Sequence, residues 1–441
     1  MYKVSVVSLG CPKNQVDAEM MLASLKNAGF EISPEEEKAD AIIVNTCGFI
    51  EAAKKEAIEN ILEAARYKKS GNCKAVIVTG CLAERYREEV LKEIKEADVC
   101  VSIGQNGNIA EIVKSAIEKK ERKDFFADNL SLPLGGERIL GGFPFSAYLK
   151  IGDGCDNCCT YCAIPKIRGR QRSRTIEDCV NEARKLADMG VKELTVVSQD
   201  TTAYGTDIYG KPMLAVLLRE LCKIEGLKWI RTLYTYPERI TDEFLTTLRE
   251  EEKLIKYIDM PIQHVDKDIL KRMNRKGDEE QLLSLIEKIR KEVPGVTLRT
   301  TLITGFPGET EEQFLSLHEF VKKARFERLG CFTYSAEEGT IAAEMENQID
   351  EQTKTDRMEH IMESQMDIME QINEQKIGKV FKTLVEGYDD YIKCYFGRTK
   401  ADAPEIDGKI FFTSGTALTF GQFVNVKVND TLDYDLLGEV V

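Results

Sequence analysis

Short runs rich in Val, Ile and Leu alternate with longer amphipathic segments along most of this 441-residue chain. In the first part of the chain the runs are "KVSVVSL" (3–9), "AIIVNT" (41–46) and "AVIVTG" (75–80). Continuous apolar runs of this kind are typical of parallel strands that helices cover on both faces. The pattern therefore predicts an α/β domain with a doubly wound parallel sheet over residues 1–132.

A second series of strand and helix patterns follows a stretch rich in Gly and Pro at 133–145, which predicts a linker. Its strand patterns lie at 146–151, 193–198, 229–234, 255–260, 297–304 and 328–334. Six consecutive strand–helix units predict an incomplete (βα)6 barrel, with a charged helical segment completing a domain over 146–376. In such barrels the chemistry lies at the carboxyl ends of the strands.

The last segment, 378–441, has a different character. Short strand patterns such as "VFKTLVEGY" and "QFVNVKVN" are separated by Gly and Asp turns, which predicts a small antiparallel β-barrel of the OB-like kind. It carries seven Lys and Arg against ten Asp and Glu, a net charge of −3. Because phosphate binding needs local positive charge, this barrel is predicted to be a poor nucleic-acid-binding module, unless a small basic patch exists within the acidic total.

Composition indicates the cellular compartment and the kind of partner. No apolar run is long enough to span a membrane, and the N-terminus has no signal-peptide pattern, so a cytoplasmic protein is expected. In a reducing compartment, 13 cysteines indicate metal ligation or burial more than disulfides. The formal net charge of −14 argues against a chain-wide nucleic-acid surface and suits a basic partner.

Four cysteines occur within "GCDNCCTYC" at 154–162, directly after the first barrel strand. Two adjacent CxxC pairs make a poor zinc site, because neighbouring Cys158 and Cys159 cannot easily face one ion. A redox CxxC leaves two thiols unexplained. The alternative is CxxxCxxC, in which Cys155, Cys159 and Cys162 hold three irons of a [4Fe–4S] cluster. The fourth iron then stays open to a substrate or cofactor.

Three strand patterns of the N-terminal domain also end in cysteine, at Cys11, Cys47 and Cys81. The carboxyl ends of parallel strands meet at one edge of a sheet, so these thiols can converge although they are far apart in sequence. Three unrelated buried cysteines are the alternative. Each follows its strand beside turn-forming residues, which favours a second three-thiolate set. The other cysteines are predicted to be core or incidental: Cys73, Cys100, Cys179, Cys222, Cys331 and Cys394.

CxxxCxxC after the first strand of a six-unit barrel resembles the radical S-adenosylmethionine superfamily. The resemblance implies that the cluster on Cys155, Cys159 and Cys162 binds S-adenosylmethionine and cleaves it to a 5′-deoxyadenosyl radical, and that Cys158 is not a ligand. Two three-cysteine sets, a radical barrel and a terminal β-barrel of the TRAM type resemble the methylthiotransferases over essentially the whole chain. That family implies two [4Fe–4S] clusters and a sulfur species on the N-terminal one.

Within this family some members modify tRNA, and one branch modifies the β-carbon of an aspartate in the twelfth protein of the small ribosomal subunit. The stretches that resemble this branch are "SLGCPKNQVDAE" (8–19), "SQDTTAYG" (198–205), "YIDMPIQHVDKDILKRMNR" (257–275), "YSAEEGT" (334–340) and "FGRTKADAPEIDG" (396–408). One S-adenosylmethionine would donate the methyl group and another the radical, with no catalytic residue beyond the cluster ligands.

The resemblance also implies partners. They are a basic ribosomal protein, on the small subunit or its assembly, and an electron donor such as flavodoxin or ferredoxin. Binding to a membrane or to tRNA is not expected. The protein is expected to be a monomer. One rival is a tRNA adenosine methylthiotransferase, which would want a basic terminal barrel. Another is a non-catalytic iron–sulfur redox sensor that binds ribosomes, which predicts no cofactor cleavage.

Further residues are predicted around the clusters. By family position Ser198, Gln199 and Asp200 would contact the methionyl part of the cofactor, unless they form an ordinary strand-end turn. Gly305 and Glu309 would line its adenosine, unless that segment is only a tight turn.

Other predictions concern charged groups. His264 would face the cavity or be structural, and Arg272, Arg275 and Lys276 are expected to be a solvated basic loop. Asp402, Glu405 and Asp407 are expected together on an exposed loop of the terminal barrel, where they would attract a basic substrate.

Overall fold

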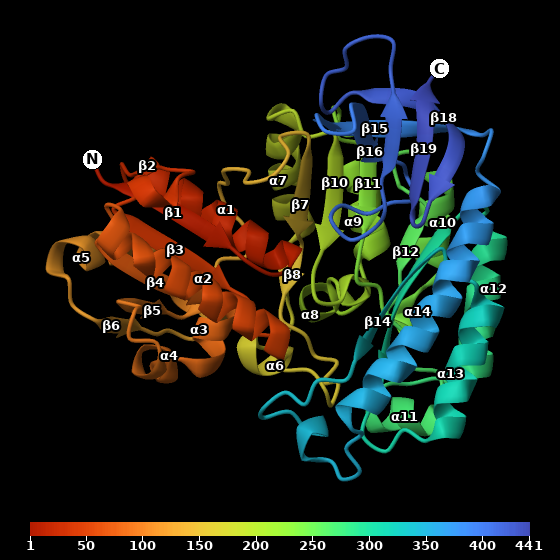
Figure 1. The fold of residues 1–441 in the computed structure, drawn as a ribbon, viewed down its shortest axis with the longest axis horizontal. Coiled ribbons are helices and arrows are strands. Elements are labelled where there is room, and N and C mark those ends of the chain that lie inside the picture. The colour runs from red at the N-terminus through yellow and green to blue at the C-terminus, as the bar shows by residue number, and fades with distance from the viewer.

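The computed structural model describes residues 1–441 and shows three domains in chain order (Figure 1). The N-terminal α/β domain lies beside a larger α/β barrel, and a small β-barrel sits on one end of that larger barrel. No helix combines the length and the apolar character that crossing a bilayer requires.

The N-terminal domain is a six-stranded parallel sheet in the order β2-β1-β3-β4-β5-β6. Its strands are β1 (Lys3–Ser8), β2 (Glu31–Ile32), β3 (Ala41–Thr46), β4 (Ala75–Gly80), β5 (Val99–Val101) and β6 (Lys123–Phe125). One face packs against α1 (Pro12–Asn27) and α5 (Ile109–Lys119). The other packs against α2 (Glu51–Ser70), α3 (Cys81–Tyr86) and α4 (Glu88–Glu93). Helices on both faces confirm the predicted doubly wound sheet.

The middle domain is an open barrel of six parallel strands. They are β7 (Ser146–Lys150), β10 (Glu193–Val197), β11 (Trp229–Thr232), β12 (Tyr257–Asp259), β13 (Thr297–Thr304) and β14 (Arg328–Thr333). They form two three-stranded sheets, β11-β10-β7 and β12-β13-β14, joined by a bridge between Ile230 and Leu254. Because β7 and β14 do not pair, the barrel is incomplete, as predicted.

Helices cover the outside of this barrel, and a core of 45 buried residues lies mostly between them and the strands. The main ones are α7 (Ile176–Asp188), α9 (Leu214–Cys222), α10 (Asp242–Glu250), α11 (Lys267–Arg272), α12 (Glu279–Glu292), α13 (Glu311–Ala324) and α14 (Glu351–Glu374). Capping residues begin several of these helices. Thr310 and Gln313, for example, form a reciprocal capping box at the start of α13.

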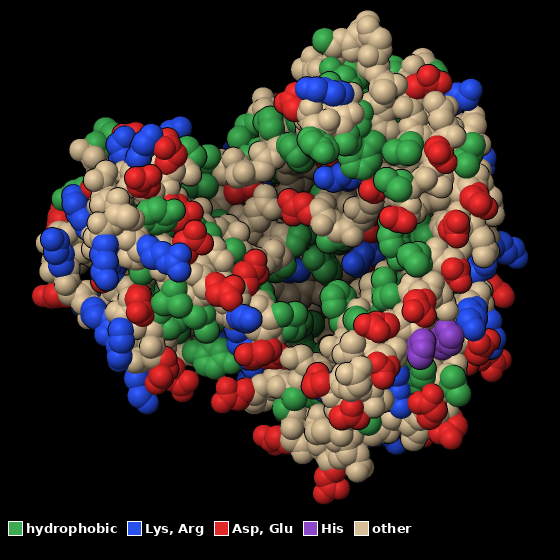
Figure 2. Space-filling model, viewed as in Figure 1, with side chains coloured by type: hydrophobic (Ala, Val, Ile, Leu, Met, Phe, Trp, Pro, Cys, Tyr) green, Lys and Arg blue, Asp and Glu red, His purple; other side chains and the backbone are tan.

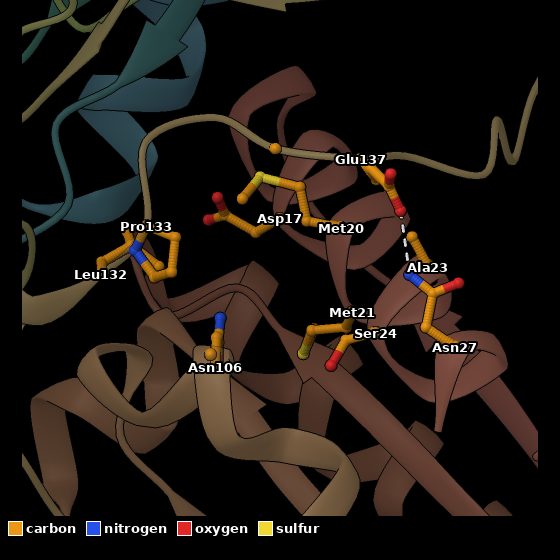
Figure 3. A pocket seen from close by; sticks show the side chains of 12 residues that line it. Asp17, Met20, Met21, Ala23, Ser24, Asn27, Asn106, Leu132, Pro133 and Glu137 are labelled. Atoms are coloured by element: carbon orange, nitrogen blue, oxygen red, sulfur yellow. Dashed lines mark hydrogen bonds between the residues drawn. The ribbon is translucent and has the colours of Figure 1, made fainter. Parts of the chain in front are cut away.

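Helix α1 lies against β7, at the open side of the barrel, with Val16 packed in one cluster with Tyr148 and Val197. The segment predicted as a linker, 133–145, forms a strap that buried ion pairs hold against the two larger domains. Its Arg138 is buried and donates to Glu19 Oε2 of α1 at 2.6 Å and to Glu182 Oε1 of α7 at 2.7 Å. Between α1 and this strap lies a cavity of about 370 Å³ (Figure 3), which none of the predicted cluster cysteines lines.

The C-terminal domain is the expected small barrel, closed in the order β15-β16-β17-β19-β18. Its strands are β15 (Val380–Asp389), β16 (Cys394–Arg398), β17 (Ile410–Thr413), β18 (Phe423–Leu432) and β19 (Asp435–Val440). The pairing is antiparallel except between β17 and β19, which run parallel. The prediction of a fully antiparallel barrel is therefore wrong for one strand pair, β17 with β19.

The prediction of an exposed acidic loop at 402–407 is wrong. Asp402 is only 3% exposed and pairs with Arg328, the first residue of β14. Asp407 is buried and accepts a hydrogen bond from the Tyr257 hydroxyl, at the start of β12, at 2.6 Å. Only Glu405 is exposed. The segment plugs the amino-terminal end of the larger barrel, where its acids meet cations that the sequence could not reveal as neighbours.

Candidate active site

Cys11, Cys47 and Cys81 follow the carboxyl ends of β1, β3 and β4, at one edge of the N-terminal sheet. Gly10 has φ of +90°, and a side chain on it would come within 2.8 Å of the Cys47 Cβ. The loop that carries Cys11 is thus packed directly on Cys47. Cys11 and Cys47 both lie close enough to Cys81 to raise the pKa of its thiol. The structure brings the three predicted thiols together.

Cations and burial set the electrostatics of this N-terminal cysteine set. Burial raises the pKa of Cys81 to about 12 and also raises that of Cys47. For Cys11, burial acts in the same direction, but Lys13 and Arg168 outweigh it and lower its pKa. Arg168 Nη2 lies 3.4 Å from Cys81 Sγ. Positive groups beside buried thiols favour thiolates, the form that binds iron.

The set does not suit a single metal ion, because no three Cys, His, Asp or Glu side chains of the structure are arranged around one point. A cubane cluster is different, since each thiolate binds its own iron. Three thiols at one sheet edge, with two cations beside them, fit that donor set.

The second set, Cys155, Cys159 and Cys162, lies on the loop between β8 (Gly152–Asp153) and α6 (Ile164–Ile167), just past the carboxyl end of β7. The loop turns tightly, with the Cys162 amide donating to the Cys159 carbonyl at 3.0 Å. The pKa of Cys162 is raised to about 12, mainly by burial, with Cys159 and Cys155 acting in the same direction. These three thiols are therefore also neighbours.

Cys158 differs from its neighbours in both backbone and exposure. It has φ of +50°, and it is the exposed cysteine of the loop. That Cys158 is not a ligand stays a prediction.

Side chains from distant segments brace this loop. Asn157 donates to Asp200 Oδ2 at 2.9 Å, and Arg239 donates to both Asn157 Oδ1 and Asp200 Oδ2. Asn274 donates to the carbonyls of Asn157 and Cys158 at 3.1 and 3.0 Å. No sequence pattern marks Asn157, Arg239 or Asn274 as part of a site, because only the fold brings them together.

The predicted methionyl-binding residues lie beside the same loop. Ser198 Oγ accepts from the Asp200 amide, and the Asp200 carboxylate is buried and used by Asn157, Arg239 and Thr202. Gln199 Nε2 donates to Asp153 Oδ1 at 2.6 Å, while its Oε1 is buried without a partner. Asp200 therefore holds the loop, and Gln199 offers a free acceptor. Contact with the cofactor stays a prediction for all three.

Gly305 and Glu309 form a turn against α14. Gly305 has φ of +70° and its amide donates to Glu309 Oε2 at 2.9 Å. Glu309 also accepts from Arg357 at 2.8 Å, yet burial outweighs this cation and raises its pKa to about 7. Adenosine binding by this turn stays a prediction.

Two predictions about charged groups are settled by burial. His264 is structural: it is fully buried, its Nδ1 accepts from the Asp266 amide, and its Nε2 lies 3.6 Å from Glu309. Arg275 is buried, so the prediction that it is solvated is wrong. It donates to the Pro261 carbonyl at 2.8 Å and lies 4.0 Å from the centroid of the Tyr236 ring.

One short segment after β11 contacts the second cysteine set and reaches Lys13 beside the first. The Tyr234 ring lies 3.6 Å from Lys13 Nζ, beside Cys11, and the Tyr236 hydroxyl lies 2.8 Å from Cys159 Sγ. Tyr234 has φ of +60°, an uncommon conformation for a residue with a side chain. The two sets therefore border one region between the domains. Figure 2 shows a deep hollow between the N-terminal domain and the larger barrel.

A buried ionic network joins the two domains beside this region. Its members are Asp17, Lys150, Asp153 and Arg168, all nearly inaccessible. Arg168 donates to Asp17 at 2.6 Å and to Asp153 at 2.9 Å, and Lys150 pairs with both carboxylates. The network fixes helix α1, which follows Cys11, against the strand that leads to Cys155.

Family models match the chain in three places. Residues 3–102 match an uncharacterized protein family, UPF0004, residues 149–321 match the radical SAM superfamily, and residues 377–441 match the TRAM domain. These spans agree with the three domains of the structure.

Curated relatives match over the full length. Ribosomal protein uS12 methylthiotransferase RimO of Acetivibrio thermocellus is 50% identical, over 100% of this chain and 98% of the relative. The protein of the same name from Clostridioides difficile is 49% identical, over 100% and 99%.

Solved structures agree on the fold. The radical S-adenosylmethionine methyltransferase TsrM of Kitasatospora setae has a TM-score of 0.55 at 15% identity, over 75% of this chain and 72% of that one. At that identity the similarity supports the architecture alone.

Proposed function

This chain belongs to the family of ribosomal protein uS12 methylthiotransferases, and from that premise we propose that it is a radical S-adenosylmethionine enzyme that methylthiolates ribosomal protein uS12. The modified atom is the β-carbon of an aspartate. The observation that carries the proposal is the placement of two three-cysteine sets at one interdomain region, with Tyr234 on the Lys13 and Cys11 side and Tyr236 on Cys159.

We assign one [4Fe–4S] cluster to Cys11, Cys47 and Cys81 and another to Cys155, Cys159 and Cys162. When bound, the clusters and S-adenosylmethionine supply the radical, the methyl group and the sulfur species on the N-terminal cluster. The chain's own residues hold these groups in place. Arg168 offsets thiolate charge at Cys81, and the Tyr236 hydroxyl bonds the Cys159 sulfur.

In this proposal the residues at the end of β10, Ser198, Gln199 and Asp200, recognise the cofactor. Ser198 and Asp200 orient the loop of the second set through Asn157. Gln199 Oε1, a buried acceptor without a partner, is the group left for the methionyl part. Gly305 and Glu309 shape the turn that meets the adenosine.

The proposed partners follow from the substrate. The enzyme acts in the cytoplasm as a monomer, on uS12 in the small subunit or its assembly, with flavodoxin or ferredoxin as electron donor. A tRNA methylthiotransferase and a non-catalytic redox sensor are disfavoured by the full-length relatives. The charge of the terminal barrel no longer decides between protein and tRNA, because Asp402 and Asp407 are used inside the molecule.

The test is mass analysis of the product. Anaerobically reconstituted enzyme, S-adenosylmethionine and a reductant should convert uS12 to a form in which a methylthio group replaces one hydrogen of an aspartate. Removal of Cys155, Cys159 and Cys162 should abolish 5′-deoxyadenosine formation. Removal of the N-terminal set should leave that cleavage in place and abolish product. Methylthio-adenosine in co-incubated tRNA, or no cofactor cleavage by the intact enzyme, would contradict the proposal.

A further inference from the structure

Lys13 is a buried cation with no carboxylate partner. It is the second residue of α1 and only 7% exposed, and no carboxylate pairs with its ammonium group. Its Nζ lies over the Tyr234 ring, 3.6 Å from the centroid, and its charge reaches Cys11. Lysine is rarely buried without a counter-ion, so its position needs an explanation.

The nearby acids are already occupied. Asp153 is the carboxylate whose charge reaches Lys13, but it accepts from Arg168 at 2.9 Å, from Gln199 at 2.6 Å and from the Gly154 amide. Asp17 is shared by Lys150 and Arg168. No carboxylate of the protein is left to pair with Lys13. The one other anionic group that its charge reaches is the thiolate of Cys11, which binds iron in the proposed enzyme, so there is room for a carboxylate that arrives from outside.

We propose that Lys13 binds the side-chain carboxylate of the target aspartate and thereby selects aspartate as the residue to be modified. This inference rests on the proposed function. The reacting β-carbon is bonded directly to the carboxylate carbon, so the carboxylate must enter the region that both cysteine sets border. A carboxylate taken out of water needs a hydrogen-bonded cation.

The position of Lys13 favours it over the other unpaired cation nearby. Arg275 lies on the Cys159 side, over Tyr236, and already donates to the Pro261 carbonyl. Lys13 lies on the Cys11 side, where the sulfur is transferred to carbon in the proposed reaction. A carboxylate on Lys13 would hold the adjacent β-carbon between the two sets, facing the N-terminal one.

A double-mutant cycle on binding tests this. The affinity of reconstituted enzyme for uS12 is measured without reductant, so that no turnover occurs, for wild type and Lys13→Met, each with uS12 carrying the target Asp or Asn. Lys13→Met and Asp→Asn should each weaken binding by roughly tenfold or more. Together they should weaken it no further, because both remove the same contact.

Matched variants and iron content complete the test. Lys13→Arg keeps a cation and should keep part of the preference for Asp over Asn. Lys26→Met makes the same change at an exposed position of the same helix and should bind like wild type. Additive losses in the cycle would overturn the proposal. So would a Lys13→Met enzyme that loses iron but keeps the wild-type preference for Asp, since Lys13 would then serve the cluster. Failure of the wild-type enzyme to modify uS12 at all would count against the proposed function instead.

Discussion

Arg168 donates through Nη2 to the Sγ of Cys81 across 3.4 Å. The same guanidinium binds Asp17 of the N-terminal domain and Asp153 of the barrel, both buried. One residue of the α6 region therefore reaches a predicted cluster ligand and also joins two domains. A single arginine can do this because its planar group offers several donors in fixed directions and stays charged when buried.

Arg168→Met should reduce iron binding by the N-terminal set. In a background with Cys155, Cys159 and Cys162 changed to Ala, the parent should hold about four irons, and Arg168→Met clearly fewer. The unfolding midpoint should also fall, since removing one partner of a buried ion network costs about 3–5 kcal/mol. Iron analysis and thermal unfolding measure the two effects.

Arg138→Met is the matched control. It causes the same kind of defect, because it removes the arginine that pairs with buried Glu19 on α1 and Glu182 on α7. Arg138 contacts no cysteine. It should lower stability and leave the iron content unchanged. Equal iron loss in both variants would show that Arg168 acts only through folding.

The two cysteine sets should each account for half of the iron. The intact chain should bind about eight irons, and a Cys11→Ala, Cys47→Ala, Cys81→Ala variant about four. Cys158→Ser should still bind about eight, because that side chain is exposed at φ of +50° and points to no ligand role. Full iron content in the triple variant would refute the N-terminal assignment, and loss of a cluster in Cys158→Ser would refute the choice of CxxxCxxC.

His264 should make the protein sensitive to acid. Burial lowers the pKa of His264 from 6.5 to about 4, so the folded state holds it neutral. Its contribution is complete above pH 6.5 and is lost as pH falls from 6.5 toward 4, up to about 3 kcal/mol at 1.4 kcal/mol per pKa unit. The measurement is the unfolding free energy of wild type minus that of His264→Gln, at several pH values.

That difference should shrink on acidification through this window. Glu309, 3.6 Å away, acts in the opposite sense, because its pKa is raised to about 7 by burial and its contribution falls as pH rises from 4.5 to 7. Comparing two proteins that both keep Glu309 separates the histidine from it. A difference that is independent of pH would contradict the assignment.

Local patterns predicted the fold class and several strands well. Continuous apolar runs of one strand length indicated strands buried on both faces, and the strands at 41–46 and 75–80 lie within their predicted limits. Order along the chain indicated the barrel, because six strand–helix units in series leave few alternatives. The parallel pairing of β17 with β19 could not be predicted, since it depends on a crossover that strand patterns do not encode.

The candidate site was predictable only where a residue type carried a signal. Cysteines at strand ends and within one loop marked the two sets. Asn157, Arg239 and Asn274 carry no such signal, and they are assembled from three separate segments. Charge was the least reliable guide. Arg275 and Asp402 were expected at the surface because they are charged, yet both are buried beside partners supplied by other elements.

Asp402 should matter for domain docking and not for attracting a basic substrate. It is buried against Arg328 and also accepts from the Thr399 amide and hydroxyl, so Asp402→Ala leaves buried Arg328 with only the more distant Asp407, at 3.9 Å. The expected cost is about 3–5 kcal/mol. Glu405, three residues later on the same segment, is exposed and only meets the Tyr148 hydroxyl at 3.4 Å, so Glu405→Ala should cost less than about 1 kcal/mol. Thermal unfolding and limited proteolysis near residue 377 compare the two. If the terminal barrel stays docked and equally stable in Asp402→Ala, while uS12 turnover falls and regains its wild-type value at high salt, then Asp402 would be the substrate-steering residue that the structure excludes.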